Sequence, residues 1–189
     1  MSLSPFWSFF YWLWIALEVW VAVATRARRT HATLHDRGTQ ALLWGVIVLS
    51  LTANGFLRHL HLAPMHAPDA WIKPTALAVL LLGLAVRIAA IRTLGKGFSA
   101  NVATRADQRL QCSGLYSVVR HPSYLGMVLI FIAIGLHAGD WVCLAVTLTP
   151  TTLALLYRIH VEEQALRGLF GSAYDEYSRA TKRLIPGIY

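Results

Sequence analysis

The stretch SGLYSVVRHPSYLG, residues 113–126, places charged and ring-bearing side chains directly before an apolar run. Pro122 suits the first position of the helix that follows, where a missing N–H costs nothing. Free backbone N–H groups at such a helix start favour an anion, such as a carboxylate. His121 adds a hydrogen-bond donor or acceptor near neutral pH. The pattern predicts an anion-binding site at this helix start.

The tyrosines of the same stretch widen the range of ligands. Tyr116 and Tyr124 offer aromatic faces and hydroxyl groups, which suit stacking on a ring such as adenine. The alternative interpretation is membrane anchoring, in which Arg120 extends to lipid head groups and the tyrosines form an interfacial belt.

A second polar stretch, YRIHVEEQALRGLF, covers residues 157–170. Arg158 and Glu162 are four residues apart, so they share one face of a helix. Glu162 could accept hydrogen bonds from a ligand amine or ribose, and the planar guanidinium of Arg158 suits a substrate carboxylate. The alternative is a surface ion pair worth about 0.3–0.5 kcal/mol. Glu163 points elsewhere, toward solvent or a nearby arginine.

The composition places these stretches in a membrane protein. The chain has 189 residues, of which 56% are hydrophobic and only 14% charged. The net charge of +8 comes from basic residues between apolar runs, which favours a membrane over a nucleic-acid partner. Cys112 and Cys143 form neither a disulfide framework nor a zinc spacing. His59, His61 and His66 are poorly spaced for a metal, so no metal site is expected.

The apolar runs predict an all-α integral membrane protein of one domain, residues 1–189. We expect about five transmembrane helices, at residues 6–24, 40–57, 74–94, 123–138 and 141–157. The fourth is short, and with the fifth it forms a helical hairpin in which Pro150 introduces a kink. The first run is aromatic-rich without a basic start, so we interpret it as a retained helix rather than a signal peptide.

The basic residues also predict orientation. They gather after the first helix, between the third and fourth helices, and after the fifth, whereas the opposite side holds only Arg58 and Lys73. The positive-inside rule therefore places the N-terminus outside and the C-terminus in the cytoplasm. The two polar segments 95–122 and 158–189 both face the cytoplasm, where they could close over one another. The end of the chain is typical of a basic amphipathic helix on the cytoplasmic leaflet.

Three polar residues fall inside the predicted membrane helices: Glu18, Asn54 and Arg87. Ionisable groups in a membrane are functional candidates by default. Glu18 needs a partner or a proton to stay buried. Arg87 lies near the cytoplasmic end, from which it could extend to the interface.

The order of motifs resembles a known family. SGLYSVVRHPSYLG, a hairpin, RIHVEE, GSAYDEY and LIPGIY, from Leu110 to the end, are similar to the isoprenylcysteine carboxyl methyltransferase family. Five helices resemble its shorter prokaryotic members. The Arg-His-Pro-x-Tyr-x-Gly core is shared with wider relatives, including phospholipid N-methyltransferases.

This resemblance implies an integral membrane enzyme that uses S-adenosylmethionine without a Rossmann domain, and GKGFSA indeed lacks the Rossmann glycine spacing. It implies a cytoplasmic cofactor pocket closed by the C-terminal segment, and a lipid-like or prenylated substrate that enters from the bilayer. Arg158 would orient the substrate carboxylate as the catalytic residue. The implied cofactor-binding residues are Gln108, Arg109, Leu110, Gln111, Tyr116, His121, Pro122, Ser123, Tyr124 and Glu162.

Rival functions remain open at this point. The acceptor could be a phospholipid amine or a small thiol, for which His121 or His160 could act as a base. A sterol-type NADPH-dependent membrane reductase and a non-catalytic scaffold are further alternatives. For a prenyl chain, the candidate groove residues are Leu125, Val128, Leu129, Ile132, Leu153 and Leu156. The oligomeric state is left open.

Overall fold

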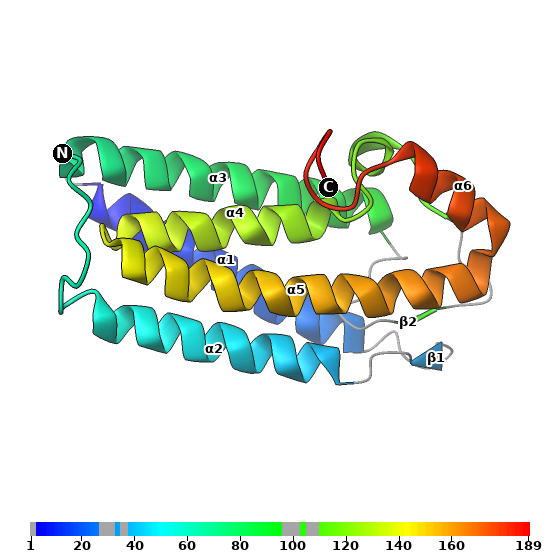
Figure 1. The fold of residues 1–189 in the computed structure, drawn as a ribbon, viewed down its shortest axis with the longest axis horizontal. Helices are drawn as coiled ribbons and strands as arrows, with labels where there is room; N and C mark the ends of the chain where they lie inside the picture. Colours follow the sequence, from blue (N-terminus) through cyan, green and yellow to red (C-terminus); the bar gives the residue numbers. More distant parts are fainter. Residues whose placement is uncertain (1–2, 27–32, 35–37, 96–102, 105–109) are drawn as a thin grey trace.

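The structure is a computed structural model that describes residues 3–26, 33–34, 38–95, 103–104 and 110–189. Figure 1 shows long helices running along the longest axis of the molecule, with a short helix at one end. The elements are α1 (Ser4–Arg26), β1 (Thr33–Leu34), α2 (Thr39–Leu57), α3 (Asp69–Leu94), β2 (Ala103–Thr104), the 3₁₀ helix η3 (Gly114–Ser117), α4 (Pro122–His137), α5 (Trp141–Phe170) and α6 (Ser172–Ala180). The two short strands pair antiparallel.

The predicted all-α membrane class is confirmed. Four helices in the described part of the chain are long and apolar enough to cross a membrane, namely α1, α2, α3 and α5. The fourth predicted helix, α4, has 16 residues and is the short one expected from the sequence. Helix α5 continues through Pro150 to Phe170, well past the apolar run that predicted it.

A tight hairpin joins α4 to α5. Asp140 precedes α5 and accepts hydrogen bonds from the N–H groups of Val142 at 2.8 Å and Cys143 at 3.2 Å. It also accepts one from the N–H of Ala63 at 2.8 Å, which fixes the loop between α2 and α3 to the same turn. A side-chain acceptor at this position satisfies N–H groups that the first helical turn leaves unpaired.

The core lies between α2, α3, α4 and α5, with α1 contributing Trp14. Leu80, Ile130, Phe131 and Leu155 are fully buried there. The backbones of α3 and α4 touch where Gly83 faces Gly126: a Cβ built on Gly126 would lie 2.8 Å from the carbonyl oxygen of Gly83. Small residues allow this close approach between membrane helices.

Polar contact also joins α2 to α5. Asn54, one of the three polar residues predicted inside the membrane, donates to Thr147 Oγ1 at 2.8 Å and to the Cys143 carbonyl at 3.3 Å. Asn54 and Thr147 are both buried. This contact lies at the opposite end of the bundle from α6 (Figure 1).

The described parts of the two polar segments meet at one end of the bundle, as the sequence predicted (Figure 1). Val119 and Lys182 form a parallel β-bridge. The N–H of Arg120 donates to the Lys182 carbonyl at 2.7 Å, and the N–H of His121 donates to the Arg183 carbonyl at 3.0 Å. The C-terminal tail, residues 181–189, is therefore docked on the start of α4.

Candidate active site

A chain of hydrogen bonds links Arg158 to Glu162 through a tyrosine from another helix. Arg158 Nε donates to the hydroxyl oxygen of Tyr124 at 2.9 Å. That hydroxyl donates in turn to Glu162 Oε2 at 2.8 Å. Arg158 is 2% exposed, whereas the Glu162 side chain is 31% exposed. The two residues that the sequence placed on one helix face thus meet through Tyr124, at the border between the buried core and the open end of the bundle.

Thr39 supports the same arginine from α2. Its Oγ1 accepts a hydrogen bond from Arg158 Nη1 at 3.0 Å, and Thr39 is 1% exposed. Sequence reasoning missed this residue, because 119 positions separate the two partners and a lone threonine at a helix start has many structural uses.

His121 lies beside this chain. Its ring stacks on that of Tyr124, with centroids 5.6 Å apart and planes 19° from parallel. Nδ1 lies 3.9 Å from Glu162 Oε2, and Nε2 lies 3.4 Å from Glu163 Oε1. Nε2 is buried and makes no hydrogen bond of good geometry among the described residues. A buried ring nitrogen without a full partner is a group that a ligand could satisfy.

The backbone at the start of α4 is more engaged than the sequence predicted. The N–H groups of Tyr124 and Leu125 both donate to the His121 carbonyl at 3.1 Å. The N–H of His121 is used by the C-terminal tail. Since Pro122 has no N–H, the predicted row of free donors is wrong for these positions. An anion at this site would depend mainly on side chains.

Tyr116 is packed rather than open. It is 7% exposed, its hydroxyl donates to the Ala90 carbonyl at 3.4 Å, and its own carbonyl accepts from the Tyr177 hydroxyl at 2.7 Å. Burial, followed by the negative charge of Glu162, raises the pKa of Tyr116 above its usual range. The hydroxyl therefore stays protonated at physiological pH.

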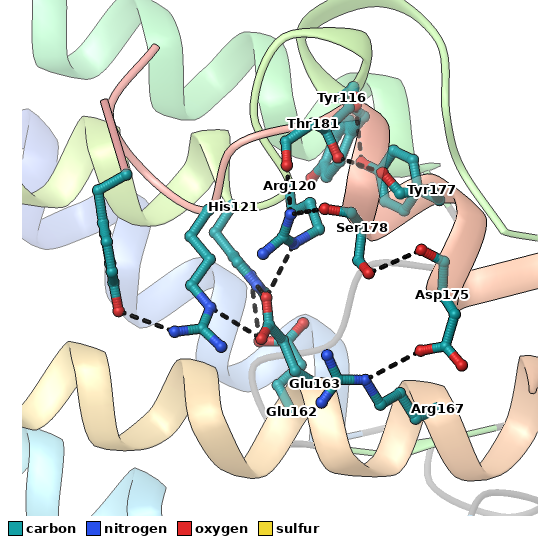
Figure 2. A network of polar contacts seen from close by, with 12 residues as sticks. Tyr116, Arg120, His121, Glu162, Glu163, Arg167, Asp175, Tyr177, Ser178 and Thr181 are labelled. Atoms are coloured by element: carbon teal, nitrogen blue, oxygen red, sulfur yellow. Dashed lines mark hydrogen bonds and ion pairs between the residues drawn. The ribbon is translucent and has the colours of Figure 1, made fainter. Parts of the chain in front are cut away.

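Glu163 is the centre of a second network, which Figure 2 shows between the tail and α5. Its Oε1 accepts from Arg120 Nε at 2.9 Å, and its Oε2 accepts from Arg183 Nε at 2.9 Å. The carboxylate is 2% exposed. The prediction that Glu163 points away from Arg158 and Glu162, toward an arginine, is confirmed. The alternative, that Glu163 points toward solvent, is wrong, because the side chain is buried.

Arg120 belongs to this network and does not extend to lipid head groups. Its side chain is 9% exposed, and its Nη1 donates to the carbonyls of Ser178, at 2.8 Å, and Thr181. Tyr174 of α6 is fully buried on the same side. The predicted amphipathic C-terminal helix thus packs against the bundle through α6 and closes one side of the site.

The remaining predicted residues lie around this cluster or outside the described residues. Pro122 is the first residue of α4 and is buried, and Ser123 bonds to Arg87. Gln111 donates to Ser113 Oγ at 2.8 Å, and the Leu110 carbonyl accepts from the Cys112 thiol, so these contacts do not join that stretch to the cluster. Gln108 and Arg109 lie outside the described residues.

The donor set suits a cofactor that carries both an amine and an acid. Glu162 presents a partly exposed carboxylate, and His121 places its Nδ1 3.9 Å from that carboxylate. Among residues 3–26, 33–34, 38–95, 103–104 and 110–189, no group of three His, Cys, Asp or Glu residues could hold a metal ion. The arrangement can bind an amino-acid-like ligand and fix a carboxylate near Arg158.

The candidate prenyl groove lies on the outer faces of the hairpin. Leu125, Val128 and Leu129 of α4 are partly exposed, and Leu153 of α5 is 61% exposed. Their neighbours Ile130 and Leu155 point into the core instead. These faces are open to an apolar ligand or to lipid.

The model of the isoprenylcysteine carboxyl methyltransferase (ICMT) family matches residues 76–168. Those residues include α4 and the Arg158–Tyr124–Glu162 chain, but not α1, α2 or the C-terminal tail.

Individual proteins give a similar result. The chain is 32% identical over 116 residues to a protein-S-isoprenylcysteine O-methyltransferase of Schizosaccharomyces pombe, covering 60% of this chain and 49% of that protein. It is 40% identical over 73 residues to methanethiol S-methyltransferase 1 of Bradyrhizobium diazoefficiens, covering 38% of this chain and 24% of that one. The chain spans about half the length of the curated isoprenylcysteine relatives it matches.

A solved structure of the eukaryotic intramembrane Ras methyltransferase ICMT has the same fold over most of the chain. The TM-score is 0.62 at 26% sequence identity, and the match covers 76% of this chain and 51% of that one.

Proposed function

We propose that the chain is a member of the isoprenylcysteine carboxyl methyltransferase family, whose model matches residues 76–168, and that it is an S-adenosylmethionine-dependent membrane methyltransferase. Its acceptor is the carboxylate of an isoprenylated cysteine or of a similar lipid-like molecule. The observation that carries the proposal is the buried Arg158, which Tyr124 joins to the partly exposed Glu162. One side of this chain of hydrogen bonds suits a carboxylate, and the other suits the amine or ribose of a cofactor.

Side chains at the start of α4 and on α5 bind the cofactor. Glu162 can accept hydrogen bonds from the amine or the ribose, and His121 offers Nδ1, which lies 3.9 Å from the same partly exposed carboxylate. Tyr124 stacks on His121 and keeps its ring in place. When bound, S-adenosylmethionine supplies an electrophilic methyl group that an ionised carboxylate accepts without losing a proton. The site therefore needs no general base.

Arg158 orients the acceptor. Its guanidinium is held from two sides, by Tyr124 and Thr39, so it is already fixed before a substrate arrives. Alignment of two reactants can lower a barrier by about 7–11 kcal/mol in favourable cases. Burial at 2% exposure also removes water, which strengthens the interaction of Arg158 with a carboxylate.

The placement in the membrane follows from charge and lipid access. We place the N-terminus outside and the site in the cytoplasmic interface, in agreement with the positive-inside rule. A prenyl chain can lie against the exposed apolar faces of α4 and α5, where each buried CH₂ contributes about 0.8 kcal/mol. The acceptor then reaches Arg158 from the bilayer, while the cofactor enters from water.

A small thiol is the second candidate acceptor. The segment shared with the methanethiol S-methyltransferase favours it. A thiol with an ordinary pKa must lose its proton, so this reaction needs a base. His160 is exposed and bonded to Gln164, and the His121 ring is enclosed by two carboxylates. Neither histidine is placed as clearly for this role as Arg158 is for a carboxylate.

The first experiment is calorimetric titration of the detergent-solubilised protein with S-adenosylhomocysteine, with NADPH in parallel. Micromolar binding of the homocysteine compound alone supports methyl transfer, whereas binding of NADPH alone overturns it in favour of a reductase. Transfer of a labelled methyl group to N-acetyl-S-farnesylcysteine, to methanethiol or to phosphatidylethanolamine then separates the acceptors.

The division of labour is tested with Arg158→Ala. We expect it to lose most methyl transfer, at least 100-fold in kcat/KM, while S-adenosylhomocysteine affinity changes less than threefold, because Arg158 binds the acceptor. Arg167→Ala is the matched control on the same helix, since Arg167 lies about half exposed beside Asp175. Equal losses of activity and cofactor affinity in Arg158→Ala would contradict the assignment.

A further inference from the structure

Two of the polar residues predicted inside the membrane form an ion pair. Arg87 of α3 donates from Nε to Glu18 Oε1 and from Nη2 to Glu18 Oε2, the latter at 2.6 Å. Trp14 Nε1 donates to the same carboxylate at 3.2 Å. Both charged side chains are 5% exposed, so Arg87 does not extend to the interface, and Glu18 has the partner that its burial requires.

The third nitrogen of Arg87 reaches the start of α4. Nη1 donates to Ser123 Oγ at 2.7 Å and to the Ser123 carbonyl at 3.3 Å. Ser123 is the second residue of α4 and stands between Pro122 and Tyr124. One guanidinium thus connects α1 and α3 to the turn that carries His121 and Tyr124.

Close contact of two backbones makes this reach possible. Gly126, one turn after Ser123, lies against α3 so closely that a Cβ there would be 2.8 Å from the backbone nitrogen of Arg87. The backbone of Arg87 therefore lies next to α4. Its guanidinium can donate hydrogen bonds to Glu18 from one edge and to Ser123 from another.

Stability alone is a weak reason for such a pair. Apolar residues of similar volume often replace a buried ion pair without loss of stability, and charge within a membrane is costly. A planar, permanently charged group with donors on several edges has a more specific use, which is to fix the direction of each partner. The partner that belongs to the candidate active site is Ser123.

We propose that Glu18 and Arg87 are positioning residues of the methyltransferase site: Glu18 orients the guanidinium of Arg87, which holds Ser123 and the first turn of α4 so that His121 and Tyr124 face the cofactor. The cofactor part of this inference rests on the proposed function. It also gives α1, which lies outside the matched family segment, a role in catalysis at a distance from the reacting atoms.

The conservative variant Arg87→Lys separates positioning from simple charge pairing. A lysine keeps the positive charge for Glu18, but one ammonium group cannot serve both carboxylate oxygens and Ser123 in a plane. Glu18→Gln keeps the shape of the partner and removes its charge. The matched control is Asn54→Leu, which breaks an intramembrane polar contact at the other end of the bundle.

Two readouts are measured on each full-length variant in detergent, together with its melting temperature. The first is amide hydrogen exchange in the peptide that covers residues 119–127. The second is the dissociation constant of S-adenosylhomocysteine. We expect Arg87→Lys and Glu18→Gln to exchange at least fivefold faster in this peptide, and to bind about tenfold more weakly, equal to about 1.4 kcal/mol. Asn54→Leu should lower the melting temperature as much as these two variants do. It should change neither the hydrogen exchange of this peptide nor the dissociation constant of S-adenosylhomocysteine.

Wild-type exchange and affinity in both variants would overturn the inference, as would equal changes in Asn54→Leu. If wild-type protein does not bind S-adenosylhomocysteine, the proposed function fails instead. In that case, faster hydrogen exchange in Arg87→Lys and Glu18→Gln, but not in Asn54→Leu, still supports the positioning of α4 by Arg87. Unchanged exchange in both variants overturns this positioning role.

Discussion

Arg183 Nε lies 2.9 Å from Oε2 of Glu163, which fixes the C-terminal tail to α5. The other oxygen of the same carboxylate holds Arg120, from the turn before α4. Two arginines from distant segments therefore share one buried negative charge (Figure 2). The hydrogen bonds between Arg183 and Tyr189, and between the backbones of residues 184–185 and 189, fold the tail back on itself.

Replacing Glu163 should release the tail. In Glu163→Gln both arginines lose their ionic partner in a buried place, and breaking a buried pair costs about 3–5 kcal/mol. We expect lower thermal stability and several-fold faster tryptic cleavage after Lys182 and Arg183, measured by limited proteolysis with mass spectrometry. Asp175→Asn is the control: it breaks the pair with Arg167, in which both side chains are about half exposed, and should change stability by less than about 1 kcal/mol. Cleavage at the wild-type rate would show that other contacts hold the tail.

Removing the Tyr124 hydroxyl should uncouple Arg158 from Glu162. Tyr124→Phe keeps the ring on His121 but deletes both hydrogen bonds. Hydrogen bonds to charged groups contribute about 1.5–3 kcal/mol, so we expect kcat/KM to fall about 10- to 100-fold in a methyl-transfer assay. Tyr157→Phe, on an exposed position of the same helix as Arg158, is the control and should retain full activity. An unchanged kcat/KM in Tyr124→Phe would argue that Thr39 alone orients Arg158.

A methyl group at Gly126 should force α3 and α4 apart. The added Cβ would meet backbone atoms of Gly83 and Arg87 at 2.8 Å, and backbone cannot turn aside as a flexible side chain can. Overpacking of this kind costs about 1–3 kcal/mol, so Gly126→Ala should melt at a lower temperature. Gly45→Ala in α2 is the matched control, because nothing lies within 4 Å of its Cβ position. There alanine should be neutral or slightly stabilising, as the better helix former.

The contact between α6 and η3 should weaken at high pH. Burial raises the pKa of Tyr177 to about 12, and its neutral hydroxyl donates to the Tyr116 carbonyl. A phenol with a raised pKa in the folded state contributes stability that is fully present below about pH 10, the unfolded value. This contribution is lost as pH rises toward 12. Tyr177→Phe should flatten the fall in melting temperature between pH 10 and 12, and an equally steep fall in that variant would assign it to other groups.

The sequence was sufficient for the parts of the fold that local pattern determines. Long apolar runs predicted where α1 to α4 lie and where α5 begins, because a bilayer-spanning segment must be apolar over its length. Helix α5 continues to Phe170, well past its apolar run. The four-residue spacing of Arg158 and Glu162 correctly predicted a shared helix face. The common side of their charges also suggested that the segments 95–122 and 158–189 could close over one another, and the tail pairs with residues 119–121.

Contacts between distant segments could not be predicted in the same way. Thr39 meets Arg158 across 119 positions, and Arg87 meets Glu18 across 69. Such pairs depend on how helices are rotated and how closely they approach, which Gly83 and Gly126 set for α3 and α4. The donors at the start of α4 were predicted to be free, but Tyr124 and Leu125 donate to the His121 carbonyl. The tail accepts from the N–H of His121, which a local pattern does not reveal.

The length of α5 makes the depth of the site depend on the thickness of the lipid around it. Its 30 residues form a rod of about 45 Å, and Arg158 lies about 26 Å along it from Trp141. The hydrocarbon layer of a bilayer measures about 30 Å, so Arg158 stands close to its edge. A helix of this length, with Pro150 inside it, meets a thinner or thicker bilayer by tilting, by kinking or by deforming the lipid around it, each at a modest cost. Under the proposed function, the depth of Arg158 and its access to a lipid-anchored carboxylate would therefore vary with the acyl-chain length of the host membrane.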